Sequence, residues 1–233
     1  MESNWETAKV NGEPMRLYVS RPDGPGPFPG VVVAQHRDGV DEFVQEMTKR
    51  LARAGFLAAA PEIYHRDGPD CRDDGPTRAT RLRDATVIKD GNAAVEFLKE
   101  QPMLKAGKIG IVGFCQGGRV AYLMACVNES LKVCVSYYPG NLFSAQGPGP
   151  APFELSRQIA GPLLAHFGQE DGNPSPEHMG KLDDELTKLG KPHEFYSYPG
   201  AGHAFMNFSS GTYRPDAEKA SWPRTLDFLK RYL

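Results

Sequence analysis

Short apolar runs alternate with amphipathic segments along most of this chain. Continuous apolar runs at 30–35 and 56–60 predict strands buried on both faces, the kind found in parallel sheets. Between them, apolar residues at helical spacing from Phe43 to Ala54 predict a helix that ends at Gly55. Repeated strand–helix alternation predicts an α/β fold with a mostly parallel sheet and helices on both faces.

The same alternation continues to the C-terminus. Further strands are predicted at 108–112, 131–138, 162–167 and 193–198, and further helices at 78–100, at 119–124, from Ser175, and around Trp222, Leu226, Leu229 and Leu233. The inner side of the 78–100 helix is expected to carry Ala85, Val87, Ile88, Ala94 and Leu98. The polar segment 66–76 predicts a surface loop near the functional site.

The N-terminal segment predicts a β-hairpin. Asn11-Gly12 supplies the positive φ angles of a tight turn between Trp5–Val10 and Met15–Val19. The Pro/Gly-rich stretch 22–29 follows too short a segment to separate two domains, so one domain over 1–233 is expected.

Charge and cysteine content exclude several classes of function. A net charge of −2 gives no electrostatic basis for binding nucleic acid or an anionic membrane, and no apolar run approaches membrane-spanning length. The N-terminus lacks the features of a signal peptide, and the four cysteines lack metal-ligand spacing. We therefore expect a cytoplasmic monomer or small homo-oligomer that acts on a small molecule, with no metal, cofactor, nucleic acid or membrane partner.

The segment Gly113-Phe114-Cys115-Gln116-Gly117-Gly118 reads as a nucleophile elbow with cysteine in the nucleophile position. It follows a predicted strand and precedes a predicted helix, which is the context that this motif requires. A cysteine at a helix N-terminus is also favoured as the reactive thiolate by the helix dipole. The alternative is a glycine-rich turn with an inert cysteine.

Two later loops supply an acid and a base in the order found in α/β-hydrolases. Asp171 follows the strand predicted at 162–167, and His203 follows the strand at 193–198. Carboxyl ends of parallel strands meet at one edge of the sheet, where ligands bind. Cys115, Asp171 and His203 are therefore expected to lie together as nucleophile, acid and base.

From about Gly30 onward the chain resembles the dienelactone hydrolase family of the α/β-hydrolase superfamily. The resemblance depends chiefly on the Cys115 elbow and on Gly202-His203-Ala204-Phe205, with support from Ala34-Gln35, 60–64, 168–171, 198–201 and 225–229. It implies an α/β-hydrolase fold in which Cys115 is the nucleophile, His203 the base and Asp171 the orienting acid. Because Gln116 directly follows the nucleophile, its backbone N–H is expected to be one oxyanion donor. The resemblance implies that the backbone N–H of Arg37 is the other.

The chain departs from the family at two places near the expected site. Where relatives carry an acidic residue after Ala-Gln it has His36, which could stabilise the thiolate or have a structural role. Where relatives carry a carboxylate-binding arginine after the catalytic histidine it has Phe205-Met206-Asn207. His36 and Asn207 are therefore candidate substrate contacts. A substrate carboxylate would fall to Arg78, Arg81 or Arg83, with Arg81 the closest by register, or all three form a solvated helix face.

The leading hypothesis is a hydrolase of small activated esters or lactones that works through an acyl-cysteine intermediate. One alternative is a general carboxylesterase or thioesterase with an unknown acyl group. Another is a non-catalytic protein in which Cys115 senses oxidants or binds a ligand. The complete Cys-Asp-His order favours an enzyme, because a sensor needs no orienting acid.

Overall fold

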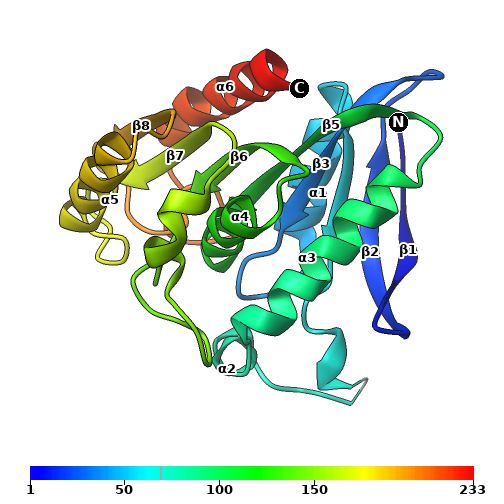
Figure 1. Cartoon of the computed structure of the whole chain (residues 1–233), viewed down its shortest axis with the longest axis horizontal. Helices are drawn as coiled ribbons and strands as arrows, with labels where there is room; N and C mark the ends of the chain where they lie inside the picture. The colour runs from blue at the N-terminus through cyan, green and yellow to red at the C-terminus, as the bar shows by residue number, and fades with distance from the viewer. Residues whose placement is uncertain (69) are drawn as a thin grey trace.

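An eight-stranded sheet runs through the molecule in the order β1-β2-β4-β3-β5-β6-β7-β8 (Figure 1). The computed structural model describes residues 1–68 and 70–233. The strands are β1 (Glu2–Val10), β2 (Glu13–Arg21), β3 (Phe28–Ala34), β4 (Leu57–Pro61), β5 (Leu104–Phe114), β6 (Leu131–Tyr137), β7 (Leu163–Gly168) and β8 (His193–Tyr198). All neighbours from β4 to β8 pair in parallel, whereas β2 pairs antiparallel with both β1 and β4.

Helices cover both faces of this sheet. They are α1 (Glu42–Arg53), α2 (Gly75–Thr80), α3 (Asp84–Lys99), α4 (Gln116–Val127), α5 (Pro176–Lys188) and α6 (Pro215–Tyr232), with 3₁₀ turns η1 (His65–Asp67) and η2 (Pro152–Gln158). Buried residues of α1 and α6 form one apolar core with one face of the sheet, and those of α3, α4 and α5 form a second core with the other. This is the predicted α/β-hydrolase fold.

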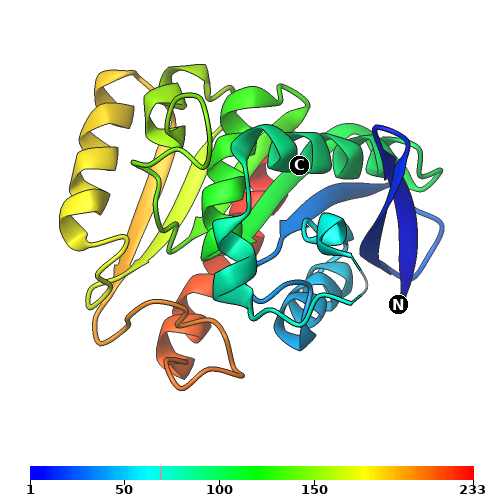
Figure 2. The same ribbon diagram turned by 90° about the horizontal axis from the view of Figure 1, so that it is seen from below.

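The N-terminal hairpin was correctly predicted, and its turn has φ angles of 51° at Asn11 and 90° at Gly12. Seen from below, the hairpin lies at one end of the molecule and α5 at the other (Figure 2). No helix in the described part of the chain combines the length and apolar character needed to cross a membrane.

The single helix predicted over 78–100 is wrong, because the structure divides it into α2 and α3. The backbone is extended at Arg83, with φ −130° and ψ 133°. The next residue, Asp84, then begins α3 with its N–H donating to the carbonyl of Gln146 and its carboxylate paired with Arg119. Partners more than thirty residues away fix this break, so local helical spacing could not reveal it.

The inner face predicted for this helix is correct in part. Val87, Ala94 and Leu98 are buried, but Ala85 is exposed and Ile88 only partly covered. The register differs because the buried face of α3 also holds two carboxylates. Asp90 is fully buried and accepts hydrogen bonds from the Arg66 guanidinium, while Asp84 pairs with Arg119.

Candidate active site

Cys115 lies on the sharp turn between β5 and α4, with φ 58° and ψ −118°. This region of backbone space is costly for a residue other than glycine, and such strain concentrates at functional sites. The turn is possible because its neighbours lack side chains: a Cβ on Gly113 would lie 1.9 Å from the carbonyl oxygen of Gly117, and one on Gly117 would lie 2.0 Å from that of Ala34. The elbow thus presents the thiol at the carboxyl edge of the sheet.

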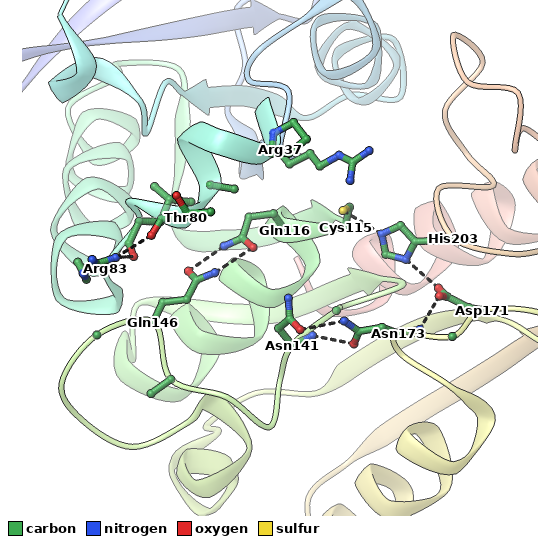
Figure 3. A pocket seen from close by; sticks show the side chains of 17 residues that line it. Arg37, Thr80, Arg83, Cys115, Gln116, Asn141, Gln146, Asp171, Asn173 and His203 are labelled. Atoms are coloured by element: carbon green, nitrogen blue, oxygen red, sulfur yellow. Dashed lines mark hydrogen bonds and ion pairs between the residues drawn. The ribbon is translucent and has the colours of Figure 1, made fainter. Parts of the chain in front are cut away.

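The structure brings Cys115, His203 and Asp171 into one chain of hydrogen bonds. His203 Nε2 lies 2.9 Å from the Cys115 sulfur, and His203 Nδ1 lies 2.9 Å from Asp171 Oδ2 (Figure 3). Since a carboxylate only accepts hydrogen bonds, Nδ1 is the donor, which leaves Nε2 to exchange a proton with the thiol. These are the contacts that a nucleophile, a base and an orienting acid require.

The surroundings of His203 favour its imidazolium form. Burial disfavours this charge, but the hydrogen bonds to Asp171 and Cys115 outweigh it and raise the pKa of His203 to about 10. A cationic imidazole beside the sulfur in turn stabilises negative charge there. The geometry therefore places a cationic imidazole in contact with the Cys115 sulfur.

Two residues that the sequence analysis did not identify hold this arrangement. Asn173 donates its backbone N–H to the second oxygen of Asp171 at 2.8 Å, so both carboxylate oxygens have partners. The buried ring of Tyr138 packs edge-on against His203, with centroids 5.2 Å apart. Tyr138 follows β6, and Asn173 follows Asp171 by two residues. Their positions just after strands were the only sequence signal that could have identified them as residues of the site.

A cleft of about 920 Å³ opens beside the thiol. Cys115, His203 and Asp171 lie at one end, and Thr80 and Arg83, from α2 and the turn before α3, lie toward the other (Figure 3). Its volume is in the range of small-molecule sites. Four carboxamide side chains also line it, those of Gln116, Asn141, Gln146 and Asn173.

The two predicted oxyanion residues, Gln116 and Arg37, both line the cleft. The N–H of Gln116 begins α4, where a backbone donor has no acceptor within its own helix. The Arg37 carbonyl accepts a 2.7 Å hydrogen bond from the Tyr64 hydroxyl, which fixes the backbone of its loop. Both residues thus lie at the cleft, and their role as oxyanion donors stays a prediction.

His36 lies outside the set of described residues that line the cleft. Its Nε2 is 2.9 Å from Asp41 Oδ1, and its Nδ1 is 3.6 Å from Asp38 Oδ2. Although burial raises the pKa of Asp41, its contacts with His36 and with the N–H of Val44 hold that pKa below its ordinary value. The structure thus gives His36 a local role at the start of α1 and does not bring it to the thiol.

The structure engages two of the three candidate arginines elsewhere. Arg81 binds Asp67 and Asp73, and Arg78 binds Asp67. Arg83 lines the cleft, with one guanidinium nitrogen bound to the carbonyls of Thr80 and Leu82. Sequence register favoured Arg81 as the arginine that binds a substrate carboxylate, whereas the geometry favours Arg83. The difference arises because Arg81 is paired with Asp67 and Asp73.

Asn207 is also placed away from the cleft-lining residues of the described chain. It is almost fully buried, and its side-chain oxygen accepts a hydrogen bond from the N–H of Ser209 at 3.0 Å. Asparagine commonly closes a turn in this way. The contact of Asn207 with substrate stays a prediction that its position outside the cleft lining does not support.

The remaining cysteines differ from Cys115. Burial raises the pKa of Cys126 to about 12 and that of Cys134 well above its ordinary value, so both stay protonated thiols. Cys71 is partly exposed on the segment before α2. Among residues 1–68 and 70–233, no group of three or more His, Cys, Asp or Glu is arranged to hold a metal ion.

Comparison with known proteins gives a consistent result over nearly the whole chain. The profile of the dienelactone hydrolase family matches residues 15–233. A Synechocystis protein named "Putative carboxymethylenebutenolidase" is 30% identical over 225 residues, which cover 93% of this chain and 91% of that protein. A Bradyrhizobium protein named "Probable 2-oxo-3-(5-oxofuran-2-ylidene)propanoate lactonase" is 29% identical over 235 residues, 99% of this chain and 94% of the other.

Among solved structures, a Klebsiella pneumoniae protein described as a "Putative Dienelactone Hydrolase" is similar to this chain over its full length. The two superpose with a TM-score of 0.92 at 30% identity, and the alignment covers 99% of each chain. This likeness includes the hairpin as well as the parallel part of the sheet.

Proposed function

Since this chain belongs to the dienelactone hydrolase family, we propose that it hydrolyses small activated esters or lactones through an acyl-cysteine intermediate. The observation that carries the proposal is the hydrogen-bonded chain from Cys115 through His203 to Asp171 at one end of a cleft. The chain order of the three residues, the hydrogen-bond distances between them and the cationic form of His203 all support nucleophilic catalysis.

In the acylation step, the Cys115 sulfur attacks the ester carbonyl and a sulfur–carbon bond forms. The carbonyl oxygen takes up negative charge, which the N–H groups of Gln116 and Arg37 stabilise. As the carbon–oxygen bond to the leaving group breaks, the His203 imidazolium donates its Nε2 proton to the departing oxygen. In a lactone this oxygen remains attached to the acyl group.

In the deacylation step, neutral His203 accepts a proton from water, and the resulting hydroxide attacks the thioester carbon. The sulfur–carbon bond then breaks, which releases the acid product and regenerates the thiolate–imidazolium pair. Asp171 holds the ring through Nδ1 during both steps and stabilises its cationic form.

Two arginines can contribute to substrate choice. Arg83 lies toward the end of the cleft away from the thiol, and the half-exposed Arg37 guanidinium lies at the thiol end (Figure 3). Either can attract an anionic substrate, but Arg83 already donates to the carbonyls of Thr80 and Leu82, and Arg37 Nε lies 3.9 Å from the Asp38 carboxylate. We therefore place neutral activated esters and lactones first and carboxylate-bearing lactones second.

A panel of aryl esters and lactones tests this proposal on three proteins. Wild type and Cys71→Ser, a control that removes the other partly exposed thiol, are expected to turn over activated esters. Cys115→Ala is expected to lose turnover while keeping its fold, as judged by circular dichroism. Acid quenching during turnover of p-nitrophenyl acetate should trap an acetyl group on the Cys115 peptide, detected by mass spectrometry.

The same experiment separates an enzyme from a thiol sensor. A sensor would be acylated once at Cys115 and would release no further product, whereas an enzyme releases acid continuously. Near-wild-type turnover by Cys115→Ala would show that another residue is the nucleophile.

A further inference from the structure

A buried arginine lies beneath the wall of the cleft. Arg119 is fully buried on α4, one turn after Cys115, and is the largest side chain with so little exposure. It binds both oxygens of Asp84, and it also donates to the carbonyl of Asn141 at 3.1 Å and to that of Ser144 at 2.7 Å. This one guanidinium therefore connects α4 to the start of α3 and to the loop after β6.

The loop after β6 is fixed to α3 as well. The N–H of Gln146 donates to the Asp84 carboxylate at 2.8 Å, and the N–H of Asp84 donates to the Gln146 carbonyl at 2.7 Å. Gly147 packs so tightly on Arg83 that a Cβ there would lie 2.7 Å from the arginine Cδ. Gln146 thus has a defined backbone position at the wall of the cleft.

The side chain of Gln146 is paired with that of Gln116. Gln116 Nε2 donates to Gln146 Oε1 at 2.9 Å, and Gln146 Nε2 donates to Gln116 Oε1 at 3.2 Å. We call this reciprocal pair the amide bridge. Gln116 follows Cys115 directly and Gly147 contacts Arg83, so the amide bridge lies between the thiol and the arginine, as Figure 3 shows.

We propose that the amide bridge limits the size of the acyl group that fits beside Cys115, with Gln146 as the specificity-determining residue and Arg119 as its positioning residue. The proposal deepens the ester hydrolysis proposed above and rests on it. It assigns to this protein a preference for short acyl groups, held in the part of the cleft between the thiol and the amide bridge.

The physical reason is the loss of two mutual hydrogen bonds. A short acyl group leaves the amide bridge intact. A longer apolar chain must separate the two carboxamides to enter the remainder of the cleft. Both Nε2 groups and Gln116 Oε1 would then lose their partner in the amide bridge, and Gln146 Oε1 would keep only its 3.4 Å contact with Arg119. Leaving a polar group buried and unpaired is more costly than the hydrogen bond itself, so longer chains are rejected even though the cleft has the volume for them.

The test compares p-nitrophenyl acetate with p-nitrophenyl hexanoate and uses the ratio of their kcat/KM values. Gln146→Ala removes the amide bridge and is expected to raise the hexanoate-to-acetate ratio about tenfold, the discrimination typical of a small change in pocket shape. Gln169→Ala, an exposed glutamine on the loop after β7, is the matched control and should leave the ratio unchanged. An unchanged ratio in Gln146→Ala would overturn the proposal.

A charge-sensitive substitution adds a readout that a purely structural role would not give. In Gln146→Glu, a protonated carboxyl can still donate to Gln116 Oε1, whereas a carboxylate cannot. The ratio should therefore be near that of wild type while the new carboxyl is protonated, and it should rise as pH increases through the pKa of that carboxyl. The Arg119 guanidinium, 3.4 Å from Gln146 Oε1, favours the ionised form, and the Asp84 carboxylate beside Gln146 opposes it. Ionisation of the thiol affects both esters equally and cancels in the ratio. A ratio independent of pH would contradict the proposal.

Arg119→Lys tests positioning through a residue that does not touch the substrate. Lysine keeps a positive charge for Asp84, but it cannot reach the carbonyls of Asn141 and Ser144 together. We expect the ratio to shift in the same direction as in Gln146→Ala, with kcat/KM for acetate changed less than that for hexanoate. An equal loss for both esters would assign Arg119 a general structural role.

Alkylation of Cys115 keeps this test separate from the proposed function. Iodoacetamide and the bulkier N-benzyliodoacetamide probe the space beside the sulfur without any turnover, and peptide mass spectrometry distinguishes Cys115 from Cys71. If wild type hydrolyses no ester, the proposed function fails. Even then, Gln146→Ala should increase the rate of Cys115 alkylation by the bulky reagent more than the rate by the small one, with no such change at Cys71. Equal acceleration of both reagents would overturn the amide bridge as a size limit.

Discussion

Two histidines on neighbouring parts of the sheet have opposite electrostatic environments. His166 lies within β7, is fully buried, and contacts the hydroxyls of Tyr198 and Thr225 at 2.7 and 3.0 Å. His203 lies on the loop after β8 and contacts a carboxylate and a thiol. One ring has only neutral hydrogen-bond partners, and the other has partners that can carry negative charge.

Protonation follows from this difference. Burial, and secondarily the charge of Arg224, lowers the pKa of His166 to about 3, whereas the Asp171 and Cys115 contacts raise that of His203 to about 10 against the effect of burial. His166 is thus a neutral structural residue at any ordinary pH. Burial alone would make both rings neutral, so the contacts with Asp171 and Cys115 at the carboxyl edge of the sheet are what favour the cationic form of His203.

The largest expected effect is the loss of catalysis on substitution of His203 or of its partner Asp171. His203→Ala removes the proton carrier and should lower kcat/KM for p-nitrophenyl acetate by about 10³-fold or more. Asp171→Asn should cost less, about 10- to 100-fold, since Asp171 orients the imidazole, whereas His203 carries the proton. Steady-state kinetics on both variants provides the measurement.

Equal and complete loss of activity in the two variants would mean that Asp171 does more than orient the ring. Thermal unfolding of each variant distinguishes this from collapse of the loop, because Asp171 also accepts the N–H of Asn173.

The second effect is on stability alone. His166→Phe removes one hydrogen bond from each of the Tyr198 and Thr225 hydroxyls, which keep their contacts with Arg224 and Tyr137, and should lower the free energy of unfolding by about 2 kcal/mol. Specific activity per folded molecule should be unchanged. Urea denaturation provides the measurement, and His193→Gln is the control, because His193 contacts the exposed Asp183 and should contribute less than about 1 kcal/mol. A matching loss of activity in His166→Phe would show that the two histidines are coupled.

The outline of the site could be predicted from sequence because it depends on local rules. Glycines at 113 and 117 mark the elbow, and parallel strands bring their carboxyl ends together, so Cys115, Asp171 and His203 had to lie at one edge. These rules say nothing about which partner a polar side chain will choose. His36 lies beside Asp41 and Arg81 beside Asp67 and Asp73, contacts that depend on loop conformation.

The break between α2 and α3 shows the same limit at the level of the fold. The apolar spacing of 78–100 is compatible with one helix, and the interruption arises because Asp84 pairs with Arg119 and Gln146, which come later in the chain. A buried ion pair formed across such a separation leaves no periodic trace in the sequence.

The third prediction uses pH, and the two histidines should respond in opposite directions. For His203, whose pKa is raised in the folded state, the stabilising contribution is full below about pH 6.5 and is lost as pH rises to about 10. For His166, whose folded pKa is about 3, stability is lost as pH falls below about 6.5, since only the unfolded chain then takes up a proton.

The measurement is the difference in unfolding free energy between wild type and each histidine variant across pH. That difference should fall between about pH 6.5 and 10 for His203→Gln, and it should rise between about pH 3 and 6.5 for His166→Phe. A pair of flat profiles would mean that neither pKa is displaced by the fold.

The smallest effect is expected at His36, a third histidine that sequence position alone would place beside the thiol. Its ring contacts Asp41, whose carboxylate also caps α1 through the N–H of Val44 at 3.1 Å. His36→Gln should therefore cost about 1 kcal/mol or less of stability and leave the pH profile of Cys115 alkylation by iodoacetamide superimposable on that of wild type. Asp171→Asn, measured in parallel, should move that profile, because it withdraws the carboxylate that supports the His203 cation. A shifted profile in His36→Gln would show that this ring also reaches the thiol in solution, so that two histidines rather than one would control its ionisation.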